Sequence, residues 1–271
     1  MEHCEITDNT VEDGNAAGIH NAGTMILRNC GIRRNGCTKN SLVGGFYNYD
    51  TDKKLNTAKA YLYSCEFENN SGSTNEKRVS NFYGRENSFS VIVNTTFYGS
   101  DAGNAPIAIY GKGVTDTEAY IISCTVAGNK SSSPNVCSGI AQADSKVKVY
   151  NSIVSGNAGG HDGIWSVEST LLKLIEQRSA VISYSINAEK VFGGDAVTGL
   201  LFDPEKMLGK ASNGVVPLIG AGNPALTNGM TADQLKSIKS GREPEIDETE
   251  VVKDQKGNPR TGKVMGAYVG K

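Results

Sequence analysis

The sequence predicts an all-β fold: a right-handed parallel β-helix of about seven coils, followed by a C-terminal capping segment. Two observations predict this fold class. A short phrase returns along the first two thirds of the chain, and the 271 residues include 32 glycines, 7 prolines and only 38% hydrophobic residues. Many short strands joined by turns have such a composition, whereas helical bundles do not. We expect coils over residues 1–195 and a closing segment over residues 196–271.

The repeated phrase begins with Asn or Ser, which is usually followed by Cys. The fourth residue of the phrase is apolar and the seventh is Asn. Its copies begin at Asn29, Ser64, Asn94, Ser123 and Asn151, with frayed copies at His3 and Ser183. Successive copies lie 26 to 35 residues apart. Steps that vary this much exclude heptad and helical-hairpin arrays, and they fit a solenoid whose turns differ in length.

Apolar residues recur at fixed positions relative to the phrase, which predicts strands whose side chains stack from coil to coil. One column lies two residues before the phrase and contains Leu27, Leu62, Ile92, Ile121, Val149 and Val181. A second column, between copies of the phrase, contains Ile19, Phe46, Phe82, Ile109, Ile140 and Ile164. We expect the first residues of the phrase to form an inward polar ladder that satisfies the backbone at a bend.

The repeats resemble those of right-handed parallel β-helix proteins of bacterial surfaces. Four C-terminal motifs, at residues 201–204, 217–226, 254–260 and 265–268, occur in the order typical of "choice-of-anchor Q" domains of Bacteroidetes-like surface proteins. The repeats are also similar to those of polymorphic outer-membrane proteins, although Val269 stands where the family usually has an acidic residue. The resemblance implies a pectin-lyase-like solenoid that is secreted or on the cell surface, and it carries no shared catalytic residues. Since Cys4 already belongs to the repeat, we expect further coils before Met1.

The closing segment differs from the coils in charge and pattern. Residues 231–240 predict a short helix, capped by Thr231 and stopped by Gly241. The charged stretch from Gly241 to Lys256 is expected to loop out. Because unpaired strand edges invite aggregation, we expect residues 196–271 to cover the open end of the solenoid.

The six cysteines are expected to be free structural thiols. Cys4, Cys30, Cys65 and Cys124 share one repeat position, where in-register side chains suit disulfide geometry poorly. The other two, Cys37 and Cys137, are expected to lie some three coils apart, ~14 Å by strand spacing. With no Cys-x-x-Cys and only three histidines, the sequence predicts no zinc site.

A column of outward aromatic side chains is the strongest candidate for ligand binding. Each member follows a residue of the second apolar column: His20, Tyr47, Tyr83, Tyr110 and Trp165. Such a row would span roughly 24 Å, which suits a polysaccharide. The alternative is that the rings stack on one another and stabilise the sheet by about 0.5–1.5 kcal/mol per pair.

Paired carboxylates on neighbouring coils are the candidates for catalysis or calcium binding. Asp50 and Glu86 would form one pair, with Arg85 completing a lyase-like group, and Asp144 and Glu168 would form another. β-Helical enzymes that act on pectin use such pairs, but the further aspartates and the Arg and His motifs of these enzymes are absent. Chance alignment and weak calcium sites are the alternatives to catalysis.

Charge and hydropathy limit the partners. The net charge is −2, with 27 basic and 29 acidic residues mixed along the chain, so nucleic acid is not expected as a partner. The sequence contains no apolar run of about 18 residues, so it predicts no membrane span. We expect a module that binds a polysaccharide or a surface protein without catalysis, with calcium as the only cofactor the sequence suggests. The alternatives are a polysaccharide lyase or hydrolase and a passive structural spacer.

Overall fold

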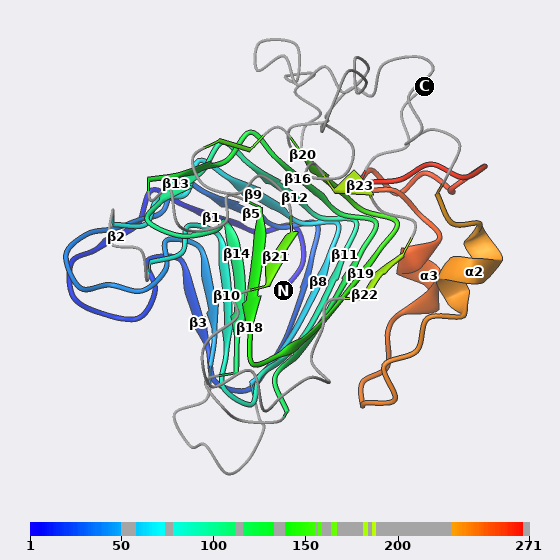
Figure 1. Ribbon diagram of the computed structural model, residues 1–271, viewed down its shortest axis with the longest axis horizontal. Helices are drawn as coiled ribbons and strands as arrows, with labels where there is room; N and C mark the ends of the chain where they lie inside the picture. Colours follow the sequence, from blue (N-terminus) through cyan, green and yellow to red (C-terminus); the bar gives the residue numbers. More distant parts are fainter. Residues whose placement is uncertain are drawn as a thin grey trace.

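The fold is a parallel β-helix, as the repeat predicts. The computed structural model describes residues 1–49, 58–73, 78–111, 116–132, 139–155, 157–158, 164–166, 181–183, 186–187 and 229–267. Within these ranges, three parallel sheets form the sides of a roughly triangular solenoid (Figure 1). Each coil passes through sheets I, II and III in that order.

The three sheets take one strand from each coil. Sheet I contains β3 (Ile19–Asn21), β7 (Phe46–Asn48), β10 (Phe82–Arg85), β14 (Ile107–Tyr110), β18 (Ile140–Ala143) and β21 (Ile164–Ser166). Sheet II contains β4 (Thr24–Arg28), β8 (Lys59–Tyr63), β11 (Phe89–Val93), β15 (Glu118–Ile122), β19 (Lys146–Tyr150) and β22 (Val181–Ser183). Sheet III contains β1 (Glu5–Thr7), β5 (Gly31–Arg33), β9 (Glu66–Glu68), β12 (Thr96–Tyr98), β16 (Thr125–Ala127), β20 (Ile153–Ser155) and β23 (Ile186–Asn187).

Two short pairs complete the strands, and the number of coils differs from the prediction. β2 (Thr10–Val11) pairs with β6 (Gly36–Cys37), and β13 (Asp101–Ala102) pairs with β17 (Lys130–Ser131). In the described part, fewer than the predicted seven coils supply a strand to all three sheets. The coil of β1 contributes to sheet III but has no described strand in sheet I or sheet II.

Stacked apolar side chains fill the interior. Leu27, Leu62, Ile92, Ile121 and Val149 pair in register through sheet II and are fully buried, which confirms this column. Its last member is wrong by one residue, since Val149 pairs with Ile182 and not with Val181. Phe46 and Phe82 stack in sheet I with ring centroids 5.3 Å apart, a pair worth about 0.5–1.5 kcal/mol beyond area burial.

The second apolar column also contains one register error. Phe82 pairs with Ile107, and Ile107 pairs with Ile140, so the predicted Ile109 is not a member of that row. Ile107 and Ile109 lie two positions apart on one strand, and both are buried in the core. Because side chains two apart share a face, the sequence pattern fits either register.

The polar ladder predicted at the start of the phrase does not point inward. Asn29, Ser64, Asn94, Ser123 and Asn151 all have φ between 51° and 54°, in the left-handed region. This conformation makes the bend between sheets II and III, and Asn94 and Asn151 bond to the C-terminal segment outside the coils. The inward ladder is instead formed by the last residue of the phrase, with Asn9, Asn35, Asn70, Asn129 and Asn157 as its asparagines.

The C-terminal segment lies along a side of the solenoid. Residues 229–267 contain α2 (Ala232–Lys236) and α3 (Glu248–Val251), and both helices lie outside sheet II (Figure 1). The segment buries Leu235, Ile246 and Val251 against the apolar outer face of that sheet. Each such side chain contributes about 1.5–3 kcal/mol. The described part of the segment therefore covers the outer face of sheet II, whereas the sequence predicts a cover over the open end of the solenoid.

The local predictions for this segment hold in part. Thr231 caps α2 in a capping box with Gln234, which confirms the predicted helix start. The helix ends at Lys236 and is capped by Ser237, so Gly241 is not its stop. The stretch from Gly241 to Lys256 does not loop out, because it contains α3 and two buried apolar residues. The predicted boundary at residues 195–196 lies outside the described residues.

Arg260 is the polar centre of the contact between this segment and the coils. Its guanidinium donates to the carbonyl oxygens of Lys253 (2.8 Å), Val264 (3.2 Å) and Gly266 (2.6 Å), and to Oδ1 of Asn94 (2.9 Å). Burial lowers the pKa of Arg260 to about 10, so the group is still charged at neutral pH. Four acceptors around a buried cation fix the segment in one position on the bend.

The last described motif closes against sheet III. Gly266 has φ +88° and donates its N–H to the carbonyl of Asn151 at 2.7 Å. A Cβ at Gly266 would lie 2.8 Å from both Thr125 Oγ1 and Ile153 Cδ1, so only glycine fits there. The next residue, Ala267, donates its N–H to the same Thr125 hydroxyl at 3.0 Å. No helix in the described part of the chain is long and apolar enough to cross a membrane.

Candidate binding face on sheet I

Three members of the predicted aromatic column lie in register on the outer face of sheet I. His20 pairs with Tyr47, and Tyr47 pairs with Tyr83, with ring centroids 5.1 Å and 5.5 Å apart. The fourth prediction is wrong in register, because Tyr83 pairs with Ala108 and Tyr110 pairs with Arg85. Tyr110 still touches Tyr83 edge to face, with centroids 5.7 Å apart. The rings therefore form a continuous contact across four coils.

The backbone of Trp165 lies at the predicted position in the column. It pairs with Ala141 on the preceding coil, and Ala141 pairs with Ala108. Two alanines thus separate it from the tyrosines, and its side chain lies outside the described part.

The column is less exposed than the sequence analysis expected. Tyr47 is fully buried and Tyr83 is 7% exposed, because both pack in a cluster with Val43, Val79 and Ala105. Burial raises the pKa of Tyr83 to about 12, so its hydroxyl is neutral at physiological pH. The predicted open row of stacking platforms is therefore wrong for the two central rings.

An outer rim of polar and aromatic groups surrounds the buried rings. His20 is exposed, and Tyr49, Arg85 and Tyr110 are partly exposed. Arg85 lies over the Tyr49 ring, 5.3 Å from its centroid, and donates to the Tyr47 hydroxyl at 3.2 Å. Its other nitrogen lies 3.0 Å from Glu86, so the guanidinium is held on two sides. We call His20, Tyr49, Arg85 and Tyr110 the sheet I rim.

The paired carboxylates do not form the predicted constellation within the described residues. Asp50 and Glu168 lie outside those residues. Glu86 is only 4% exposed and forms an ion pair with Arg85. Asp144 is in register two coils beyond Glu86, with Gly111 between them, which corresponds to ~9.6 Å of strand spacing.

No set of three or more His, Cys, Asp or Glu side chains that could hold a metal ion occurs in the described part of the chain. One member of each predicted calcium pair lies outside that part. Neither pair can therefore be assembled from the described geometry, and the calcium prediction stays a prediction.

The described cysteines are free thiols, as expected. Cys4, Cys30, Cys37, Cys65 and Cys124 form no disulfide, and Cys137 lies outside the described residues. Burial raises the pKa of Cys124 to about 12 and also raises that of Cys65. A hydrogen bond from Cys65 lowers the pKa of the neighbouring Cys30 to about 6. Cys124 N–H donates to Ser152 Oγ, so the column combines small apolar packing with local hydrogen bonds.

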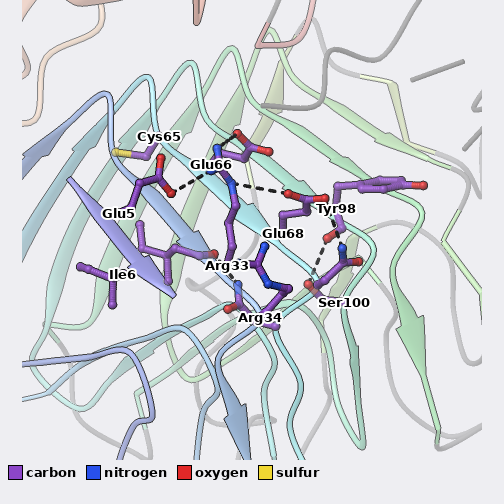
Figure 2. A network of polar contacts seen from close by, with 12 residues as sticks. Glu5, Ile6, Arg33, Arg34, Cys65, Glu66, Glu68, Tyr98 and Ser100 are labelled. Carbon is purple, nitrogen blue, oxygen red and sulfur yellow. Dashed lines mark hydrogen bonds and ion pairs between the residues drawn. The ribbon is translucent and has the colours of Figure 1, made fainter. Parts of the chain in front are cut away.

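The exposed ion pair that the sequence predicts between Arg33 and Glu68 is part of a larger network on the outer face of sheet III (Figure 2). Arg33 contacts Glu5 at 2.8 Å, Glu66 at 2.7 Å and Glu68 at 3.5 Å. Glu66 is only 2% exposed, so this network is partly buried. The signal was available, since Glu66 and Glu68 alternate on one strand and therefore share a face.

The comparisons with known proteins add no relative. No family model, no curated protein and no solved structure matches the chain.

Proposed function

We propose that this chain is a secreted or cell-surface binding module that holds a glycan or a partner protein without catalysis. One observation carries the proposal: on a rigid β-helix, the sheet I rim places Tyr49 under the guanidinium of Arg85, Tyr110 on the strand paired with Arg85, and His20 3.3 Å from the Tyr49 carbonyl. Aromatic faces stack on sugar rings, and a fixed guanidinium binds carboxylate or hydroxyl oxygens. A rigid sheet presents these groups with little loss of conformational entropy on binding.

The state of the candidate acid favours binding over chemistry. A general acid or base must reach the reacting atoms. Glu86 is buried and ion-paired with Arg85, so its carboxylate serves to hold the guanidinium in place. This arrangement supports a recognition role for the same residues that a lyase would use for catalysis.

The surface location is proposed from the resemblance to choice-of-anchor Q domains. Two of the motifs that carry the resemblance lie in the docked segment: residues 254–260 end in the buried Arg260, and residues 265–268 contain Gly266 against sheet III. Both motifs hold the segment against the coils, which gives them a structural role in closing the fold. This supports the resemblance without identifying a ligand.

A glycan array probed with the purified chain tests the binding proposal. We expect binding that falls roughly tenfold, ~1.4 kcal/mol, in Tyr49→Ala and in His20→Ala. The matched control is Tyr98→Ala, a partly exposed tyrosine on sheet III, which should bind as the parent does. Equal losses in Tyr98→Ala and Tyr49→Ala would contradict a role for the rim.

The burial of Tyr47 and Tyr83 favours a second candidate, a passive structural spacer. In that case the rings only stabilise sheet I, and no array ligand is bound. The lyase alternative has its own readout, the absorbance of unsaturated sugar ends after incubation with polyuronides. Activity that disappears in Glu86→Gln would replace the binding proposal with an enzymatic one.

A further inference from the structure

Three cysteines are stacked in neighbouring coils at the corner between sheets II and III. Cys4, Cys30 and Cys65 each directly precede a strand of sheet III, and these three strands pair in register. The backbone pairing continues through the cysteines: Gly31 N–H donates to the Cys4 carbonyl and Glu66 N–H to the Cys30 carbonyl, both at 2.9 Å. The three side chains therefore follow one another at about the coil spacing of 4.8 Å.

The sulfurs of Cys30 and Cys65 are in direct contact. The Cys65 thiol donates a hydrogen bond to the Cys30 sulfur, and this bond is the largest of the effects that lower the pKa of Cys30 to about 6. Both residues belong to the apolar core, where Cys30 is 2% exposed and Cys65 is fully buried. Cys4 contributes its backbone N–H to the Cys30 sulfur, while its own thiol donates to the Glu2 carbonyl at 3.2 Å. Cys30 and Cys65 are therefore the pair whose thiols meet.

The corner position brings these two thiols closer to disulfide geometry than the repeat alone predicts. The residues before them, Asn29 and Ser64, have φ of 52° and 54°, so each cysteine follows a left-handed bend and precedes its strand. Disulfides join Cα atoms about 4.4–6.8 Å apart, a range that includes the coil spacing. In-register side chains point the same way, but the hydrogen bond shows that these two are turned toward each other. The bond then requires the Cβ atoms to approach to about 3.8 Å.

Cys124 occupies the same column position without a thiol neighbour. The strands on either side pair in register, which places Thr95 on one side of Cys124 and Ser152 on the other. Cys124 N–H donates to Ser152 Oγ at 3.0 Å, and burial raises the pKa of the Cys124 thiol to about 12. A protonated, buried thiol is a poor nucleophile. The chain thus contains one column position both with and without a thiol partner.

We infer that Cys30 and Cys65 are a cross-link site, where an oxidising compartment converts two stacked thiols into a disulfide that fastens neighbouring coils. The Cys30 thiolate attacks one sulfur of glutathione disulfide, forms a mixed disulfide and releases one glutathione thiolate, which takes up the Cys65 proton. The Cys65 sulfur then attacks the Cys30 sulfur of the mixed disulfide, and the second glutathione leaves as a thiolate that water protonates. Two protein thiols are oxidised, and one glutathione disulfide is reduced to two glutathione thiols.

Burial decides when this reaction takes place and how long the bond persists. Cys30 and Cys65 have almost no exposed surface in the folded chain, so the oxidant reaches them while the coils assemble. Once the coils are stacked, the same burial shields the disulfide from reducing thiols. The bond closes the loop from residue 30 to residue 65, which restricts the unfolded chain and stabilises the folded one. Secreted and surface proteins meet such oxidants, and cytosolic ones do not.

Refolding in a glutathione buffer tests the inference on the unaltered chain. The full chain is reduced and unfolded, refolded with an excess of oxidised glutathione, and then alkylated in denaturant. We expect four of the six cysteines to be alkylated, and mass spectrometry to find Cys30 and Cys65 joined in one linked peptide. Reduction of the refolded chain should lower its Tm by about 5 °C or more, because the unfolded state regains its freedom.

Single variants assign the bond. Cys30→Ser and Cys65→Ser should each leave the other five cysteines alkylated, and reduction should then leave Tm unchanged. Cys124→Ser is the matched control, since it alters the same column position and should keep both the bond and the Tm difference. Cys4→Ser should also keep the bond, which separates the proposed pair from a pairing of Cys30 with Cys4. Circular dichroism checks that each variant is folded.

Three results on the parent chain would overturn the inference. The first is alkylation of all six cysteines after refolding with oxidised glutathione. The second is a linked peptide that joins Cys30 to Cys4, or a scatter of different pairs. The third is a Tm that stays the same or rises on reduction, because a bond that fits the stacked coils must stabilise them. Glycan binding enters none of these measurements, so their outcome is independent of the proposed function.

Discussion

The two ends of the repeated phrase build opposite kinds of polar ladder from the same residue type. The first position, occupied by Asn29, Asn94 and Asn151 among others, lies at a left-handed bend and turns its side chain outward. The last position, six residues later, points inward at the next bend. Backbone conformation, and not residue type, therefore decides whether an asparagine bonds within the solenoid or to the C-terminal segment.

The inner ladder bonds one coil to the next. Asn35 donates through Nδ2 to Asn70 Oδ1 at 3.2 Å, and Asn129 donates in the same way to Asn157 at 2.9 Å. The amides also donate to backbone carbonyls of neighbouring coils, as Asn70 does to Ile32 at 2.7 Å. Each of these bonds lies between parts of the coils, so one layer satisfies polar groups of the next.

The outer ladder is selective. Asn94 donates to the Glu250 carbonyl at 2.6 Å and accepts from Arg260, and Asn151 accepts from Met230 N–H at 2.9 Å. Ser64 occupies the same ladder position but has no hydrogen bond to residues 229–267 in the described part. At this ladder position the side chains of Asn94 and Asn151 therefore bond to the C-terminal segment, while the coil of Ser64 contacts it through Tyr63 and Cys65 instead.

The largest effect should come from breaking the inner ladder at Asn70. Its side chain makes four hydrogen bonds in a fully buried site, two of them from Asn35. Asn70→Ala leaves buried partners unsatisfied, and we expect a loss of about 3 kcal/mol in the free energy of unfolding, measured with denaturant.

A matched control for this prediction is Asn9→Ala at the exposed end of the same ladder. Water can replace its bond to Asn35, so the cost should stay below about 1 kcal/mol. Equal losses for both variants would show that burial does not control the contribution of the ladder.

An intermediate effect should come from the outer ladder at Asn94. Asn94→Ala removes two hydrogen bonds and leaves the buried Arg260 without one acceptor, which should weaken docking of residues 229–267 by about 2 kcal/mol. The loss should be local: hydrogen exchange should accelerate in this segment while the coils stay protected. The matched control is Ser64→Ala, which also places alanine at a left-handed backbone position and so carries a similar conformational cost. It should leave the segment protected. Faster exchange of the segment in both variants would contradict selective docking.

Much of the solenoid could be predicted because stacking repeats the same environment in every coil. A column such as Leu27, Leu62 and Ile92 is visible in sequence since each member meets the same neighbours. The direction of the two ladders was not visible, because an asparagine at a left-handed bend and one pointing inward look alike in sequence. A signal did exist: the inner position is Asn in most copies, whereas the outer one varies among Asn, Ser and His.

The candidate site was harder to predict, because alternation reveals the face of a residue but not what covers it. Tyr47 and Tyr83 do lie on the outer face, yet Val43 and Val79 pack beside them. These valines pair with each other and each precedes its strand by three residues, so they form a further apolar column beside the tyrosines. The docking of α2 and α3 on sheet II likewise depends on contacts between distant residues, which no local pattern encodes.

The smallest effect should be a pH dependence confined to the outer segment. Partial burial opposes ionisation of Glu245, but hydrogen bonds from Ser240, Gly241 and Ile246 lower its pKa from 4.5 to about 2. A folded-state pKa below the unfolded one stabilises the fold fully above pH 4.5, and this contribution is lost as the pH falls toward 2.

Hydrogen exchange at decreasing pH would separate the two ladders. The turn between α2 and α3 is attached to sheet II through Arg242, 3.2 Å from Glu118, so weakening this turn should loosen residues 229–267 first. The inner ladder consists of amides that do not titrate, and its protection should persist. Glu245→Gln should remove part of the pH dependence and leave the part due to Asp247, the cap of α3, whose pKa is also lowered. Because Glu245 is partly exposed, solvent screening makes this effect smaller than that of Asn94→Ala, and simultaneous loss of protection in coils and segment would refute the separation.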